Sequence, residues 1–124
     1  MKDYEECCIV PELINMLTHL IWSGGVDPVR KVEEAGTQLA LLRAVHNCSK
    51  NLKAGITTVR DLGSNENTAI TLAKTIERGY MFGPRIIACG YTIIMTGGYD
   101  PFWGVSADGE VEVIKAVRKQ VFER

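Results

Sequence analysis

The residue with the clearest chemical potential is a histidine in an apolar segment near the start of the chain. The stretch PELINMLTHLIWSGG, residues 11–25, carries His19 two positions after Leu17. A lone histidine in an apolar strand is either a functional group, such as a metal ligand, or a hydrogen-bonded core residue. The residues alone favour the core residue.

Two further groups of polar residues have catalytic potential. Arg60 and Asp61 end a β-branched segment, where they could act in catalysis or form an ion pair that orients the following loop; the residue types favour the ion pair. His46, the second histidine, lies in the middle of a predicted helix. It is therefore not expected to complete a metal site with His19.

A glycine-rich and aromatic segment, TGGYDPFWG at residues 96–104, is the best candidate for a loop that contacts a substrate. Gly97 and Gly98 permit positive φ and a close backbone approach, while Tyr99 and Trp103 could wall a pocket. The alternative is that these aromatic rings pack against a neighbouring helix or subunit. The composition favours neither.

Composition narrows the class of protein. The 124 residues are 46% hydrophobic, which is enough for one domain spanning residues 1–124, and 14 basic against 15 acidic residues leave a net charge of -1. This balance does not favour nucleic acid or an anionic membrane, and no apolar run reaches the ~18 residues of a membrane span. The four cysteines, Cys7, Cys8, Cys48 and Cys89, show no zinc-knuckle or C-x-x-C spacing. A cytoplasmic protein with reduced thiols is expected, without nucleic-acid or membrane partners.

Apolar periodicity predicts alternating strands and helices. A strand of about eight residues, buried on both faces, is expected within residues 8–20, and Asp27-Pro28 has the form of a helix start. The remaining predicted elements are a helix over 38–53 with a break near Gly36 and a stop at Gly55, strands at 56–59 and 85–89, and helices over 69–76 and from 111.

This alternation is typical of a parallel α/β fold with right-handed crossovers. The last predicted helix has no strand after it to complete its unit. Either another chain covers that edge or the sequence is incomplete.

The segments LKAGITTVRDLG (52–63), IERGYMFGPRIIACG (76–90) and TGGYDPFWG (96–104) occur in this order. Together they resemble the N-terminal part of the amidohydrolase superfamily, in particular its imidazolonepropionase-like and prolidase-like branch, from about Val10 to the C-terminus. The resemblance implies the first three βα units of a metal-dependent hydrolase barrel, a partial (β/α)8 TIM-barrel with its active site at the carboxyl ends of the strands. Residues 1–10 would be a remnant of a preceding β-region.

The resemblance also implies a metal site. In the family the first strand ends in a pattern like P-G-L-I-D-x-H-x-H-L, whose histidines hold a divalent metal such as zinc. His19 matches the second histidine, whereas Leu17 stands at the first, Glu12 at the glycine and Asn15 at the aspartate. The remaining ligands and the general base come from later strands, beyond the residues matched here. Zinc is therefore expected to bind weakly or not at all.

The family often has T-G-G-H where this chain has Tyr99 after two glycines. The resemblance thus predicts the N-terminal portion of an enzyme that hydrolyses C–N bonds in amides, peptides or cyclic amides, inactive alone, with small molecules or peptides as substrates of the intact family. The alternative is a non-catalytic interaction module that forms a homo-oligomer or pairs with a full-length homologue through an uncovered sheet edge and the aromatic loop.

Overall fold

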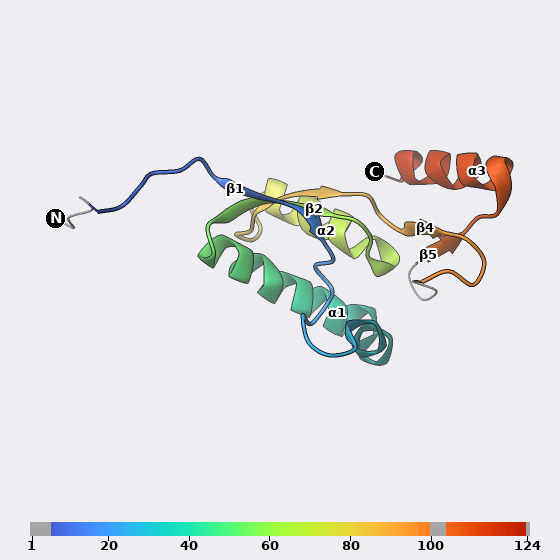
Figure 1. Cartoon of the computed structure of the whole chain (residues 1–124), viewed down its shortest axis with the longest axis horizontal. Helices are drawn as coiled ribbons and strands as arrows, with labels where there is room; N and C mark the ends of the chain where they lie inside the picture. Colours follow the sequence, from blue (N-terminus) through green and yellow to red (C-terminus); the bar gives the residue numbers. More distant parts are fainter. Residues whose placement is uncertain (1–5, 100–103, 124) are drawn as a thin grey trace.

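A computed structural model describes residues 6–99 and 104–123. Helices and strands alternate along most of this length (Figure 1). In chain order the elements are β1 (Leu13–Thr18), α1 (Pro28–Lys53), β2 (Ile56–Asp61), the 3-10 helix η1 (Asn65–Asn67), α2 (Thr68–Glu77), β3 (Arg85–Ala88), β4 (Thr92–Ile94), β5 (Gly104–Ser106) and α3 (Gly109–Phe122).

Three parallel strands form the main sheet, in the order β1-β2-β3. Helix α1 connects β1 to β2 and α2 connects β2 to β3, so each pair of neighbouring strands in this sheet is joined by a crossover helix. This confirms the predicted α/β class with parallel strands. The segment 90–104, which the sequence predicted to be a loop, holds β4 and the first residue of β5, which pair in parallel as a second sheet. Strands of three residues are too short to show a periodicity.

Helix α1 begins and breaks where the sequence predicts. The Oδ1 atom of Asp27 accepts a hydrogen bond from the amide of Arg30 at 3.2 Å, and Pro28 is the first helical residue. Gly36 interrupts the helix with a non-helical conformation, φ 67° and ψ 173°. The predicted cap and the predicted break are both confirmed.

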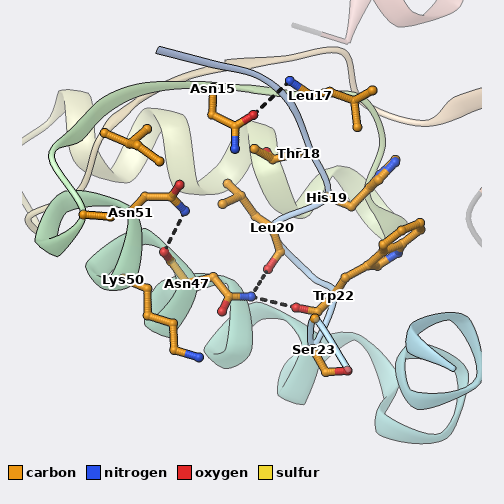
Figure 2. A pocket seen from close by; sticks show the side chains of 13 residues that line it. Asn15, Leu17, Thr18, His19, Leu20, Trp22, Ser23, Asn47, Lys50 and Asn51 are labelled. Atoms are coloured by element: carbon orange, nitrogen blue, oxygen red, sulfur yellow. Dashed lines mark hydrogen bonds between the residues drawn. The ribbon is translucent and has the colours of Figure 1, made fainter. Parts of the chain in front are cut away.

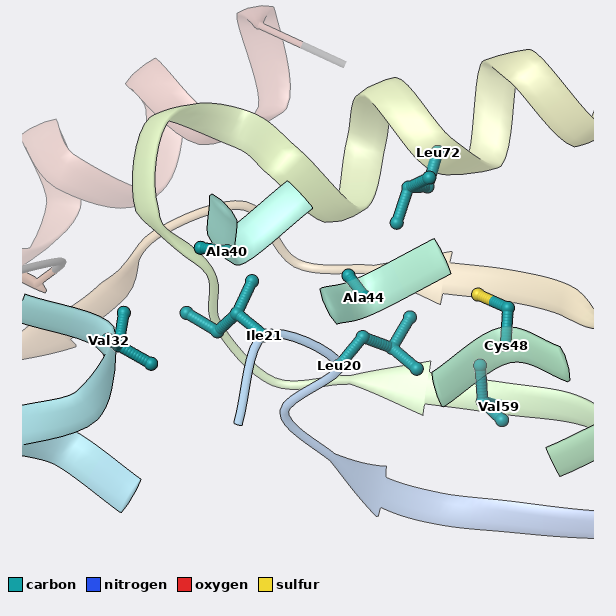
Figure 3. Packing of buried hydrophobic residues seen from close by; sticks show 8 residues of the cluster. All are labelled: Leu20, Ile21, Val32, Ala40, Ala44, Cys48, Val59 and Leu72. Atoms are coloured by element: carbon teal, nitrogen blue, oxygen red, sulfur yellow. The ribbon is translucent and has the colours of Figure 1, made fainter. Parts of the chain in front are cut away.

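The apolar core lies between the sheet and the two helices α1 and α2 (Figure 3). Two of its largest side chains, Leu20 and Ile21, come from the segment that follows β1, and they are 2% and 0% exposed. Burial of a side chain of this size stabilises the fold by roughly 1.5–3 kcal/mol. The cluster consists of Leu20, Ile21, Val32, Ala40, Ala44, Cys48, Val59 and Leu72.

The prediction that the first strand is buried on both faces is wrong. The apolar side chains of β1 are exposed by half or more, from 50% at Leu13 to 64% at Leu17. The reason is its position, because β1 is an edge strand and β2 is the one strand with which it pairs among the described residues. The chain also leaves the strand at Thr18, earlier than predicted, and only then enters the core.

Helix α3 has the apolar stripe that the sequence predicts, but most of it faces solvent. Ala116 is its buried residue, whereas Val111, Val117 and Phe122 are 79%, 47% and 91% exposed. In Figure 1 this helix lies above β4 and β5, at the right-hand end of the molecule. Among the described residues, no helix combines the length and the apolar character needed to cross a membrane.

Candidate functional site

The candidate site lies where β1 and β2 end. His19 directly follows β1, Asp61 is the last residue of β2, and Gly63 comes two residues later. Because the strands are parallel, these carboxyl ends meet at the same edge of the sheet, which is the edge where barrel enzymes carry their active sites. The fold therefore brings the two predicted polar positions, His19 and Asp61, to one place.

The imidazole of His19 is held by a hydrogen bond and a ring contact. Its Nδ1 atom lies 3.0 Å from the carbonyl oxygen of Gly63, and its ring stacks on Trp22 with centroids 4.2 Å apart and planes at 22°. A carbonyl oxygen can only accept, so Nδ1 is the donor. In the neutral ring the lone pair then resides on Nε2.

Asp61 has no exposed surface, and both of its oxygens accept backbone hydrogen bonds. Oδ2 accepts from the amide of Leu20 at 2.8 Å, and Oδ1 accepts from the amide of Gly63 at 3.1 Å. Burial raises the pKa of Asp61 to about 6, although these two hydrogen bonds and the nearby His19 act to lower it. The carboxylate thus joins the segment after β1 to the segment after β2.

The predicted ion pair between Arg60 and Asp61 is wrong. Arg60 is exposed whereas Asp61 is buried, because successive residues of a strand point to opposite faces. In the described part of the chain the ion pairs are Arg30–Glu34 and Lys119–Glu123. The role of Asp61 is therefore to accept backbone hydrogen bonds at the site.

Backbone hydrogen bonds fix the strand ends relative to one another. The amide of Leu62 donates to the carbonyl of Thr18 at 3.0 Å, and the amide of Cys89 donates to the carbonyl of Asp61 at 3.1 Å. Gly63 has φ 151°, and a Cβ atom on it would lie 2.4 Å from Cγ2 of Thr92. The carbonyl that accepts from His19 thus belongs to a residue with no room for a side chain.

An open pocket of about 580 Å³ lies beside His19. Its walls come from β1, the segment 19–24 and α1, and Figure 2 shows the amide of Asn47 reaching the backbone on the opposite side. The Nδ2 atom of Asn47 donates to the carbonyl oxygens of Leu20 and Trp22, both at 2.8 Å. Leu17 lines the same pocket as His19, but its side chain has no lone pair to offer a metal ion.

The described residues do not fit a complete metal centre. They contain no group of three or more His, Cys, Asp or Glu side chains placed to hold an ion. His46 lies within α1, as the sequence predicts, and its side chain is exposed. Zinc sites in proteins draw three or four protein ligands, so His19 alone supplies one part of such a centre.

Residues 96–99, which are described and belong to the glycine-rich segment, form a turn outside this pocket. The amide of Gly98 donates to the carbonyl of Met95 at 2.8 Å, and Gly97 has φ 73°. Tyr99 is 73% exposed, and none of residues 97–99 lines the pocket beside His19. Trp103 lies outside the described residues. The proposed substrate contacts of this segment stay a prediction.

The sequence did not predict that the carboxylate of Asp61 would hold the segment after β1 to the segment after β2. The carbonyl of Gly63 and the amide of Leu20 are backbone groups, and every residue type except proline has both, so the sequence does not indicate their hydrogen-bond partners. The signal that was available is the order Asp-Leu-Gly after a β-branched strand, with the aspartate two residues before the glycine.

Comparisons with solved structures give the same fold. A Xaa-Pro dipeptidase with methionine bound in its active site is 26% identical, with a TM-score of 0.75, and the match covers 91% of this chain and 31% of that one. An amidohydrolase is 28% identical, with a TM-score of 0.73 over 90% of this chain and 31% of that one. A prolidase complexed with N-methylphosphonate-L-proline, at 24% identity and a TM-score of 0.75 over 91% and 31%, supports the fold alone.

The chain thus spans about a third of the length of the solved proteins that it matches. No curated protein matches it at a significant level. The family model described as "Amidohydrolase family" matches residues 8–124, which is nearly the whole sequence. On this match, and on the order and direction of β1, β2 and β3, the chain belongs to the amidohydrolase family.

Proposed function

We propose that this chain is the N-terminal portion of a metal-dependent hydrolase that cleaves C–N bonds in amides, peptides or cyclic amides. The observation that carries the proposal is the geometry of His19, whose Nδ1 is engaged by a backbone carbonyl at the carboxyl end of β1. Metal-binding histidines in proteins are held in this way, with the other ring nitrogen left for the ion. Dipeptides that end in proline are the first substrates to test, because the similar solved structures include a Xaa-Pro dipeptidase.

The 124 residues are proposed to be inactive by themselves. A divalent metal in a hydrolase lowers the pKa of a bound water and polarises a carbonyl, but this needs an ion held by several ligands and a base that takes the proton. The described residues supply one imidazole. The other ligands and the base are proposed to come from outside the described residues.

Metal binding and hydrolysis test the proposal separately. Equilibrium dialysis against zinc should give less than one bound ion per chain, and the His19→Ala variant should lose what binding there is. His46→Ala is the matched control, because it removes the exposed imidazole on α1 and should leave zinc binding unchanged. Xaa-Pro dipeptides and N-acyl amino acids should not be hydrolysed. One tightly bound zinc per chain together with a hydrolytic activity that His19→Ala abolishes would refute the inactivity, and equal zinc binding by His19→Ala and wild type would refute the ligand role.

The exposed apolar side chains of β1 favour a second candidate function, association with another chain. Ile14, Met16 and Leu17 are 55%, 53% and 64% exposed on a strand that has one paired edge among the described residues. Such edges recruit further strands or aggregate. Sedimentation velocity distinguishes the two candidates: an interaction module gives a concentration-dependent mass with a saturable limit, whereas an isolated portion of an enzyme gives monomer or aggregate of no defined size.

A further inference from the structure

We infer that Asp61 is a positioning residue that fixes the tautomer of His19. Its buried carboxylate holds the amides of Leu20 and Gly63 together, which keeps a carbonyl acceptor on Nδ1 of the imidazole and leaves the lone pair on Nε2. The inference deepens the proposed function and rests on it only for the use of that lone pair. The tautomer itself is a property of these 124 residues.

The two amides that donate hydrogen bonds to Asp61 belong to the backbone next to His19 and to the residue that accepts from its imidazole. The amide of Leu20 belongs to the peptide bond directly after His19, so its hydrogen bond fixes the backbone that carries the imidazole. The amide of Gly63 belongs to the residue whose carbonyl accepts from Nδ1. One carboxylate therefore holds both the donor and the acceptor of a hydrogen bond between residues 44 positions apart.

A carboxylate suits this role better than an amide side chain. Each of the two oxygens of Asp61 faces an N–H group, at 2.8 and 3.1 Å. An asparagine would offer one acceptor oxygen and present its own NH₂ group to the other amide, so one of the two contacts would be lost. Burying a carboxylate is unfavourable unless it is hydrogen-bonded. The two hydrogen bonds from Leu20 and Gly63 therefore offset part of the cost of burying Asp61.

The surroundings restrict the other ways in which the ring could be held. Trp22 stacks on the imidazole and limits its rotation. Thr92 lies against Gly63 so closely that the backbone there has little freedom to shift. Trp22 and Thr92 each act on one side of this hydrogen bond, whereas Asp61 contacts the backbone on both sides and sets the position of the Gly63 carbonyl relative to the imidazole.

The tautomer can be measured without any metal, by ¹⁵N–¹H correlation of the imidazole nitrogens in the full chain. The chain has two histidines, and a His46→Gln variant assigns the signals. In the wild type, His19 should show a protonated Nδ1 and an unprotonated Nε2. In Asp61→Asn the His19 signals should depart from this pattern, because the carbonyl acceptor of Nδ1 is no longer fixed.

Asp108→Asn is the matched control. Asp108 also accepts from a backbone amide and a second donor, both belonging to Thr96, but at the start of α3. The same chemical change there should leave the His19 signals in place. In parallel, zinc affinity should fall about tenfold in Asp61→Asn, as is typical when the partner of a metal-binding histidine is removed, and should not change in Asp108→Asn.

Two spectra would overturn the inference: a wild type in which His19 carries its proton on Nε2, or a folded Asp61→Asn that keeps the wild-type Nδ1–H signals. If Asp61→Asn does not fold, Asp61→Glu replaces it, since the longer side chain displaces both oxygens; unchanged His19 signals in that variant would count against the inference, and shifted signals would support it. A chain that binds no zinc would refute the proposed ligand role and leave the tautomer result standing, so the two failures are distinguishable.

Discussion

Two parts of the molecule differ in how firmly their residues are held. The segment from β1 to β3 has a buried cluster of eight residues, and backbone hydrogen bonds join its strand ends. The C-terminal segment of β4, β5 and α3, as far as the structure describes it, adds two alanines, Ala107 and Ala116, to the buried apolar set. The candidate histidine lies in the first part, and the glycine-rich turn lies in the second.

The difference shows what converts a sequence pattern into a fixed geometry. Both parts contain a residue type suited to chemistry, His19 in one and Tyr99 in the other. His19 has a carbonyl, a stacked ring and a clamped backbone around it, whereas Tyr99 is 73% exposed. Packing from elements distant in sequence, more than residue type, distinguishes the two positions.

The largest expected difference in the free energy of unfolding is between two glycine variants, Gly63→Ala in the first part and Gly97→Ala in the second. Both glycines have positive φ. Gly63→Ala puts a methyl group 2.4 Å from Thr92, at a φ of 151°. Overpacking together with the unfavourable φ should lower the free energy of unfolding by about 4 kcal/mol. Gly97→Ala, where a Cβ meets nothing within 4 Å, should lower it by about 1 kcal/mol. Urea denaturation measures both, and equal losses would contradict the comparison.

The second prediction concerns how the free energy of unfolding depends on pH, because Asp61 in the first part and Asp108 in the second contribute with opposite sign. Burial raises the pKa of Asp61 from 3.8 to about 6, so between these values the folded chain binds a proton that the unfolded chain releases. The free energy of unfolding should therefore fall as the pH rises from about 4 to about 6, by about 3 kcal/mol from this group, and stay level above.

In the second part the Thr96 hydroxyl and amide lower the pKa of Asp108, so its contribution is lost as the pH falls. Urea denaturation between about pH 4 and 6 isolates the contribution of Asp61, and measurements below pH 3.8 isolate that of Asp108, each by subtraction of the asparagine variant from the wild type. A wild-type curve parallel to that of Asp61→Asn would show that Asp61 titrates at its ordinary pKa.

Third, one valine from each part tests the unequal packing. Val59 on β2 is 0% exposed and Val117 on α3 is 47% exposed. Val59→Ala should lower the free energy of unfolding by about 2 kcal/mol, and Val117→Ala by less than about 0.5 kcal/mol. Thermal or urea unfolding gives both values. A large loss at Val117 would mean that α3 is packed against another surface in solution, which would favour the interaction module.

The smallest expected effect is a gain in zinc affinity when a histidine is added near His19, with no gain when a histidine is added in the glycine-rich turn. Leu17 and His19 line the same pocket, so Leu17→His adds a second imidazole there. Zinc affinity should rise roughly tenfold, about 1.4 kcal/mol, still without turnover. Tyr99→His introduces the same side chain in the glycine-rich turn and should add no affinity. Calorimetric titration with zinc compares the two variants, and equal gains would show that the fixed surroundings of His19 are unimportant for binding.

The sequence by itself determined the elements whose signals are local. The cap at Asp27, the break at Gly36 and the order of strands and helices from β1 to β3 were predicted correctly, because a cap, a glycine or an apolar period acts within a few residues; β4 and β5 were not predicted. The motif around Gly55–Gly63 also led to the family, which the match over residues 8–124 confirms.

Tertiary structure alone decided how the candidate site is held and which surfaces are covered. Asp61 meets the amide of Leu20 across 41 positions of sequence, and His19 meets the carbonyl of Gly63 across 44. The first strand was predicted to be buried because its residues are apolar, yet Leu17 is 64% exposed. Burial and long-range hydrogen bonds depend on which elements pack together in space. The type of a residue, apolar or polar, does not determine which other elements will pack against its side chain.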